Sequence, residues 1–238
     1  MNKSIVIIPT YNEIDNIEDL IRQILNLNRE LDILVIDDNS PDGTGRLLDN
    51  LSGRFGELKL IHRHKKMGLG SAYMKGFEHV LCNGYEYIIC MDGDLSHNPA
   101  YINHFLDKIK DCDLVLGSRF LNGIHIINWS FFRLFLSLSA IKYVKLITGI
   151  SFSDPQGGFR CFRRQVIQRI VADGIISKGY LFQTELLYRT YKMGWKIEEV
   201  PIFFIDRRLG KSKLSLGIIL EALFKILIVR FKFRNLKK

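Results

Sequence analysis

Two aspartates separated by one glycine carry the strongest chemical signal in the sequence. Asp92, Gly93 and Asp94 directly follow the apolar run Tyr87–Met91. Side chains two apart on an extended chain point the same way, so both carboxylates can hold one hard cation, while Gly93 lets another group approach closely. A Mg²⁺ or Mn²⁺ ion bridging them to a diphosphate would neutralise charge on a nucleotide leaving group. The alternative is a strand end entering a turn, with Asp94 or Asn98 as a cap.

Three earlier polar loops also follow apolar runs; they are Pro9-Thr10-Tyr11-Asn12-Glu13, Asp37 to Thr44, and His62 to Gly70. In the second loop, helix capping accounts for Asp42 or Thr44. It does not account for Asp37 and Asp38, which are poor strand residues and could face a ligand's hydroxyls or a base edge. The third loop places cations and flexible glycines ahead of a helix, which suits a phosphate, although a solvated basic loop is the simpler alternative.

A dinucleotide-binding motif is disfavoured. The segment from Gly68 to Tyr73, GLGSAY, begins like a dinucleotide fingerprint, but its third glycine is missing. It also lies in the third strand–helix unit rather than the first, where that motif belongs.

Short apolar runs alternate with helical patterns through the first half of the chain, which is typical of a parallel sheet covered by helices. The expected pairs are Ile5–Ile8 with Asn16–Leu27, Ile33–Ile36 with Thr44–Leu51, Leu58–Ile61 with Ser71–Leu81, and Tyr87–Met91 with Tyr101–Ile109, followed by a strand at Leu114–Leu116. The pattern predicts an α/β fold of the doubly wound type. In such folds ligands bind beyond the carboxyl ends of the strands, where the four polar loops would meet.

Composition excludes disorder and fibrous repeats, because 47% of the 238 residues are hydrophobic and 25% are charged. The formal net charge is +9, from 34 Lys and Arg against 25 Asp and Glu. This charge indicates an anionic partner, which could be nucleic acid, an acidic membrane surface or a phosphorylated small molecule.

The cysteines and the apolar segments bear on cellular location. The four cysteines form no C-x-x-C pair, which favours a reducing compartment. The apolar run Ile5–Ile8 is too short for a secretory signal peptide. Charged residues interrupt both long apolar stretches near 124–150 and 214–238, so we expect no transmembrane span.

The loops, taken in order, resemble glycosyltransferase family 2 and, within it, the dolichol-phosphate (polyprenol-phosphate) mannosyltransferases. The resemblance covers about residues 5 to 215 and continues beyond the four loops already described. The further matching motifs are Gly117-Ser118-Arg119, Asp154 to Arg160, Gly179 to Glu185, and Arg207 to Leu214.

The resemblance implies a GT-A type domain, Rossmann-like with a mostly parallel sheet, over residues 1–213. It also implies a divalent metal, Mg²⁺ or Mn²⁺, and inverting transfer of mannose from GDP-mannose to the phosphate of dolichol or another polyprenol. The positions that match the family's nucleotide-binding loops are Pro9, Tyr11, Glu13, Asp38, Asp42, Lys66, Gly68 and Gly70.

The same resemblance assigns the metal and the catalytic residues. Asp92 and Asp94 match the metal and diphosphate motif, which is usually D-A-D, so Gly93 is a small departure. Ser96 stands where some members place a metal-binding glutamine, so a water could take the place of that ligand. Arg207 and Lys213 match a loop that closes over the donor diphosphate.

Arg119, Arg133 and Ser137 match positions that hold the acceptor phosphate. The expected catalytic set is Asp92, Asp94, Arg119 and Arg207. A lipid phosphate already carries a nucleophilic oxygen, so the reaction needs positioning and charge neutralisation more than a general base. Asp154 and the segment 183–185 match motifs near the active site, without a base role assigned to either.

Two apolar segments would attach the protein to a membrane. In the segment near 124–148, aromatic residues surround Arg133, a mixture suited to a helix lying in the lipid interface. The segment 214–238 combines a leucine stripe with a basic end, which is typical of a second, headgroup-binding helix. The alternative is that both helices pack on the protein's own sheet.

We therefore expect a peripheral enzyme at the cytoplasmic face of a membrane, the endoplasmic reticulum in a eukaryote or the plasma membrane in a prokaryote. Small membrane-anchoring subunits could assist it, as in family members that lack spanning helices. A transferase of glucose or an aminosugar from a UDP-sugar is the nearest alternative, because few residues read the sugar. A nucleic-acid-binding module is disfavoured since no RNP, KH or zinc-finger signature is present. A non-catalytic lipid-binding protein would not need the aspartate pair.

Overall fold

The computed structural model describes residues 3–27, 29–177, 179, 181–206 and 216–236. Its centre is a seven-stranded sheet in the order β3-β2-β1-β4-β7-β5-β8. The strands are β1 (Ser4–Thr10), β2 (Leu31–Asp37), β3 (Leu58–His62), β4 (Tyr87–Cys90), β5 (Leu114–Ser118), β7 (Arg160–Arg163) and β8 (Ile197–Pro201). All neighbours pair in parallel except those of β7, which is antiparallel to β4 and β5. The prediction of a mostly parallel α/β sheet is confirmed.

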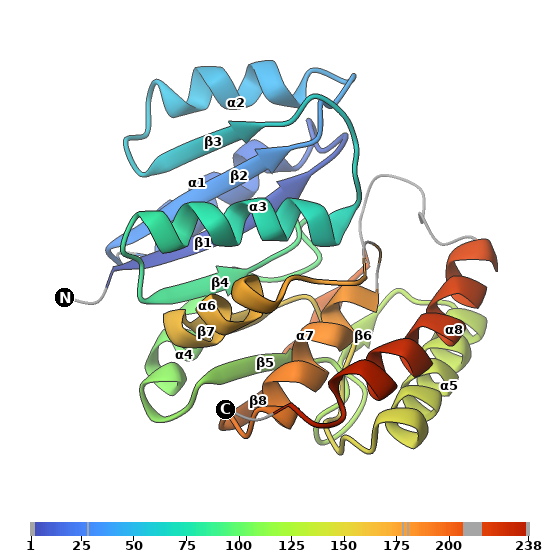
Figure 1. Ribbon diagram of the computed structural model, residues 1–238. Helices are drawn as coiled ribbons and strands as arrows, with labels where there is room; N and C mark the ends of the chain where they lie inside the picture. Colours follow the sequence, from blue (N-terminus) through green and yellow to red (C-terminus); the bar gives the residue numbers. More distant parts are fainter. Residues whose placement is uncertain (1–2, 28, 178, 180, 207–215, 237–238) are drawn as a thin grey trace.

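Helices cover both faces of this sheet (Figure 1). The first core joins one face to α3 (Leu69–Cys82), α6 (Arg164–Asp173) and α7 (Leu181–Lys192), and the second joins the other face to α1 (Ile17–Leu25), α2 (Thr44–Ser52) and α4 (Tyr101–Lys108). The β-branched residues of the central strands are fully buried, as expected for strands covered on both sides.

Strand β7 was not predicted from sequence. Its four residues lie between β4 and β5, with Cys90 opposite Arg160. The antiparallel pairing makes the preceding turn, Gly157 and Gly158, run along the carboxyl edge of the parallel strands. A second, two-stranded sheet joins β6 (Ile126–Ile127) to β9 (Phe204–Ile205) beyond the same edge.

The long helices α5 (Phe131–Thr148) and α8 (Leu216–Phe233) lie side by side at one end of the molecule (Figure 1). Ile226, Val229 and Phe233 of α8 reach the core, together with Val144 of α5. The leucine stripe of the sequence includes Leu223 and Leu227, which are half-buried, so the packed stripe of α8 is displaced by one position towards the N-terminus; the rest of the leucine stripe lies outside the described side chains. Within the described residues, no helix is long and apolar enough to span a membrane.

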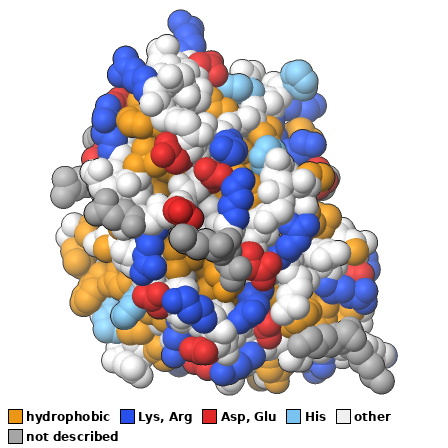
Figure 2. Space-filling model, turned by 90° about the vertical axis from the view of Figure 1, so that its left-hand side faces the viewer, with side chains coloured by type: hydrophobic (Ala, Val, Ile, Leu, Met, Phe, Trp, Pro, Cys, Tyr) orange, Lys and Arg blue, Asp and Glu red, His pale blue; other side chains and the backbone are white. Residues whose placement is uncertain are grey.

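The face formed by the amino ends of the strands carries interspersed positive and negative side chains (Figure 2). Ion pairs on this side include Lys3 with Asp32 and Lys196 with Glu198. Exposed pairs of this kind contribute little stability. Their mixture is typical of a surface that faces water.

Candidate active site at the carboxyl edge of the sheet

The loop after β2 is built around two buried aspartates with different partners. Asp37 accepts hydrogen bonds from the Thr10 hydroxyl at 3.0 Å and from the Ser40 backbone N–H at 3.0 Å. It therefore joins the loop after β1 to the loop after β2. Asp37 has a structural role here, which sequence reasoning left open.

Asp38 is held by an arginine from the loop after β3. Nε and Nη2 of Arg63 donate to its two carboxylate oxygens at 2.5 and 2.9 Å, while Nη1 donates to the Ser71 hydroxyl at 2.8 Å. The backbone N–H of Met67 approaches the same carboxylate at 3.3 Å. The bidentate pair fixes Asp38 at the strand end where the nucleotide was expected. The sequence motifs included Arg63 without assigning it a role.

Asp42 and Glu13 are connected through Thr44. Asp42 accepts from the Ile14 backbone N–H at 3.2 Å and from the Thr44 hydroxyl at 2.7 Å, and the same hydroxyl accepts from the Glu13 N–H at 3.0 Å. Partial burial raises the pKa of Asp42, but the hydrogen bonds outweigh it and leave the pKa below its usual value. Gly43, with φ of +97°, occupies the N-cap position of α2, so the interpretation of Thr44 as the cap is wrong; its hydroxyl joins the two loops instead.

The remaining nucleotide candidates surround the start of α3. The ammonium of Lys66 lies 4.0 Å from the ring centroid of Tyr11, so these two predicted residues meet. A Cβ on Gly70 would come within 2.6 Å of the Ser177 carbonyl oxygen, which requires glycine there. Pro9 is half-buried at the end of β1. Gly68, with φ of +91°, precedes the helix.

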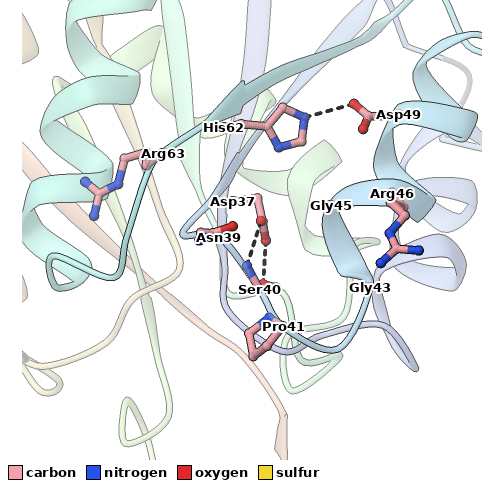
Figure 3. Close-up of a pocket in the computed structure, with 10 residues that line it drawn as sticks. All are labelled: Asp37, Asn39, Ser40, Pro41, Gly43, Gly45, Arg46, Asp49, His62 and Arg63. Atoms are coloured by element: carbon pink, nitrogen blue, oxygen red, sulfur yellow. Dashed lines mark hydrogen bonds and ion pairs between the residues drawn. The ribbon is translucent and has the colours of Figure 1, made fainter.

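A polar cavity of about 320 Å³ adjoins these loops (Figure 3). Asp37 and Ser40 form one side of it, and His62 hydrogen-bonds to Asp49 on the other. The other residues that line it are Asn39, Pro41, Gly43, Gly45, Arg46 and Arg63. Through Arg63 the cavity borders the Asp38 pair. Asp37, which could face a ligand by its sequence position, lines the cavity, whereas none of the family-matched nucleotide positions does.

The two aspartates that follow β4 differ in exposure. The Asp92 side chain is 38% exposed, whereas Asp94 is buried and accepts from the backbone N–H and the hydroxyl of Ser96 at 3.1 and 2.5 Å. Carboxylate oxygens suit a hard divalent cation. Among the described residues, no cluster of three or more His, Cys, Asp or Glu could hold a metal. The further position named from the resemblance, Ser96, offers a hydroxyl oxygen.

His97 completes the inner wall of this loop. Its ring stacks on Phe159 with centroids 5.0 Å apart, and Nδ1 lies 4.0 Å from an Asp92 oxygen. Burial lowers the pKa of His97 below its usual value, although Asp92 and Asp94 oppose this. The ring is therefore neutral near pH 7. Sequence reasoning assigned it no role.

Arg119 is held in place by Asp154. Its Nε and Nη2 donate to the two Asp154 oxygens at 2.6 and 2.8 Å, and its backbone N–H donates at 3.1 Å. Burial lowers the pKa of Arg119, but Asp154 and the more distant Asp92 raise it above its usual value. Burial likewise raises the pKa of Asp154, and Arg119 more than offsets this, leaving it below its usual value. The pair is thus ionised.

Arg133 lies next to Arg119, across one aromatic ring. The guanidinium carbons of Arg133 and Arg119 are 4.1 and 5.5 Å from the Trp129 ring centroid. Arg133 also donates to Asp206 at 2.6 Å, in a partly exposed pair. Ser137 follows one turn later on α5 and is half-buried. The predicted acceptor-phosphate residues are therefore grouped, whereas Arg207 and Lys213 lie outside the described residues.

The fold of this chain is similar to that of solved bacterial structures. Glucosyl-3-phosphoglycerate synthase from Mycobacterium tuberculosis, in complex with Mn²⁺, uridine diphosphate and glucosyl-3-phosphoglycerate, has a TM-score of 0.70 to this chain. It is 16% identical, and the match covers 97% of this chain and 79% of that one. At this identity the likeness concerns the fold.

The chain belongs to glycosyl transferase family 2, whose family model matches residues 5–171. It is 40% identical to polyprenol monophosphomannose synthase of Mycolicibacterium smegmatis over 94% of this chain and 85% of the relative. It is 39% identical to undecaprenyl-phosphate mannosyltransferase of Micrococcus luteus, over 93% and 91% respectively. The chain is therefore a glycosyltransferase, which confirms the expected family and enzyme class.

Proposed function

We propose that the chain transfers mannose from GDP-mannose to the phosphate of dolichol or another polyprenol, with inversion at the anomeric carbon. The product, a polyprenyl phosphate mannose, would supply glycan or glycolipid assembly. The observation that supports this is that Arg119 and Arg133 both lie over the Trp129 ring, while the charge of Asp92 acts on Arg119. The names of the two bacterial relatives support the sugar and the acceptor class.

The chemistry follows from charge and position. A phosphate oxygen of the acceptor is the nucleophile, so the protein's task is to align it with the anomeric carbon and to compensate charge. Asp92 and Asp94 would hold Mg²⁺ or Mn²⁺, which when bound stabilises the negative charge on the departing diphosphate. Arg119, kept in place by Asp154, would fix one side of the acceptor phosphate. Neutral His97 adds no competing positive charge.

The Asp206 carboxylate occupies the position where an oxygen of the acceptor phosphate would bind to Arg133. Its carboxylate contacts Arg133 at 2.6 Å, as a phosphate oxygen would. An incoming phosphate repels that carboxylate and offers Arg133 a more highly charged partner. Because the Arg133–Asp206 pair is partly exposed, whereas Asp154 is fully buried, exchange is easier at Arg133 than at Arg119.

The surface near Arg133 fits a lipid membrane. Every residue from Phe131 to Ala140 of α5 is exposed or half-buried, and Phe131 itself is 84% exposed. Large apolar side chains exposed on α5 and α8 are Phe131, Phe132, Phe135, Leu136, Leu146, Phe224, Ile228 and Phe231. Such an aromatic surface, with basic residues close by, is typical of an interfacial helix pair. The opposite sides of both helices pack on the protein. Membrane attachment therefore explains the exposed side of each helix, and packing on the protein's own core explains the other.

We accordingly propose peripheral attachment at the cytoplasmic face of the membrane, with the segment 214–238 as a membrane-binding helix beside the catalytic domain of residues 1–213. Small anchoring subunits would strengthen the attachment. Aromatic side chains at the interface would bring Arg133 to the depth of the lipid phosphate.

The test is a transfer assay with purified protein and dolichyl phosphate in detergent. Radiolabelled GDP-mannose and UDP-glucose are supplied separately, with Mg²⁺, Mn²⁺ or EDTA, and label entering the lipid phase is counted. Mannose transfer that EDTA abolishes is the expected result. Label from UDP-glucose alone would move the specificity to the UDP-sugar alternative, and transfer from neither donor would contradict the proposal once undecaprenyl phosphate has also been tried.

A further inference from the structure

A buried glutamine lies beside the aspartate pair without a partner for its side chain. Gln183, the third residue of α7, is almost fully buried, and neither its side-chain nitrogen nor its oxygen has a hydrogen-bond partner among the described residues. Its backbone is held in place because Arg160 donates to its carbonyl oxygen at 2.6 Å. Burying an unpaired amide destabilises a fold, so such a group in a native protein calls for a binding explanation.

The Gln183 amide lies close to Gly158 and to the Asp92 carboxylate. A Cβ on Gly158 would lie 3.4 and 3.5 Å from the two carboxylate oxygens of Asp92 and 3.6 Å from Nε2 of Gln183. The register of β7 against β4 explains the arrangement, since Arg160 lies opposite Cys90 and the chain then places Gly158 opposite Asp92. The bare face of Gly158 is therefore bordered by a carboxylate and an amide.

Packing does not require a glycine at this position. A Cβ on the neighbouring Gly157 would come within 2.8 Å of the Gly117 carbonyl oxygen, so Gly157 is needed for close backbone contact. On Gly158 the nearest atoms stay at ordinary van der Waals distance, and its φ lies outside the left-handed region. What the absent side chain provides at Gly158 is access to two polar groups.

A hydroxyl group matches this border. It can donate to the Asp92 carboxylate, which only accepts, and accept from the Gln183 amide. An ionised phosphate oxygen only accepts and could not donate to Asp92, so a neutral polyol is favoured over a phosphate. We propose that Gln183 and the open face of Gly158 form the hydroxyl-reading wall of the subsite for the donor's hexose. This inference rests on the proposed function, which brings a hexose next to Asp92.

The test compares Gln183→Met, which keeps the length of the side chain and removes its hydrogen bonds, with Gly158→Ala, which fills the open face. Calorimetric titration with GDP and with GDP-mannose, each with Mn²⁺, should show GDP affinity within about 2-fold of wild type and GDP-mannose affinity about 10-fold weaker. The preference for GDP-mannose over GDP-glucose in transfer should narrow. Gln183→Met should melt no lower than wild type because it removes an unpaired buried amide.

Thr190→Val on the same helix is the matched control. Its buried hydroxyl donates to the Leu186 carbonyl at 2.8 Å, away from Asp92, so stability should change without a change in sugar preference. Unchanged GDP-mannose affinity and preference in both test variants would overturn the inference. So would equal weakening of GDP and GDP-mannose, because Gln183 would then act through Asp92 and the cation. Failure of the wild-type protein to transfer any hexose would instead refute the proposed function itself.

Discussion

Replacing Asp154 with asparagine tests the assignment of Arg119 most directly. The Asp154 carboxylate is fully buried and accepts three hydrogen bonds from Arg119, one from its backbone and two from its guanidinium. The substitution keeps the shape but leaves a buried guanidinium charge without its counter-ion. Breaking one partner of such a pair costs about 3–5 kcal/mol of unfolding free energy. For a chain of 238 residues the melting temperature should fall by at least about 6 °C.

Differential scanning calorimetry of three variants separates the ion pair from the loss of a side chain. The double variant Asp154→Leu with Arg119→Met removes both charges, and it should be more stable than Asp154→Asn alone because no uncompensated charge stays buried. Asp107→Asn is the control, since Asp107 contacts Arg29 and Lys110 on the exposed surface and should shift the melting temperature by less than about 2 °C. A melting temperature of Asp154→Asn equal to that of wild type would refute the reasoning.

The pH dependence gives an independent check with a defined sign. The folded-state pKa of Asp154 is below its usual value, so its contribution to stability is complete above the unfolded-state pKa of about 4 and is lost as the pH falls through the folded value. The difference in unfolding free energy between wild type and Asp154→Asn should therefore stay constant from about pH 8 to 5 and shrink below about pH 4. A difference that instead grew towards acid pH would contradict an ionised Asp154.

The other predictions concern the substrates and the membrane. Asp92→Asn or Asp94→Asn should lower turnover at least about 100-fold, the scale of losing a charge-stabilising group; retained activity in the transfer assay would remove the metal role. Arg133→Ala should raise the KM for lipid acceptor while the Kd for GDP stays near normal, and equal losses would contradict the acceptor assignment. Asp206→Asn should lower the acceptor KM, because the phosphate no longer competes with a carboxylate for Arg133. An unchanged KM would contradict competition between Asp206 and the phosphate. Neutralising the basic end at 230–234 with glutamine should weaken binding to acidic liposomes in a salt-dependent way, and unchanged partition would favour core packing as the main role of this helix.

That last change is a substitution rather than a truncation for a structural reason. Phe233 is buried in the core, and the Tyr188 hydroxyl hydrogen-bonds to the Arg230 carbonyl oxygen. Deleting the chain from residue 230 would remove these contacts together with the charges. A loss of liposome binding would then report damage to the α7–α8 packing as readily as lost attraction to headgroups.

Periodicity predicted the parallel part of the fold because each strand there is a short β-branched run followed by an amphipathic helix. It missed β7, whose sequence Arg160-Cys161-Phe162-Arg163 shows neither a β-branched run nor clear alternation. Arg160 is fully buried in that strand and donates to the carbonyl oxygens of Gly157, Pro155 and Gln183. A buried arginine satisfied by three turn and helix carbonyls has no signature in a single sequence.

In the candidate site, the positions of the loops could be predicted from sequence, but the pairings of their side chains could not. The loops themselves were predictable, since polar residues at the carboxyl ends of parallel strands meet at one edge. Their pairings were not, because Asp38 with Arg63, Arg119 with Asp154 and Arg133 with Asp206 each join residues 25 or more positions apart. The pairings matter for function, since they make two arginines of the same expected role unequal: a buried carboxylate keeps Arg119 in place, while Arg133 can exchange a partly exposed one for a phosphate. An acceptor that must displace Asp206 to bind has to carry a phosphate charge, so a polyprenol without its phosphate should not compete with the phosphorylated lipid.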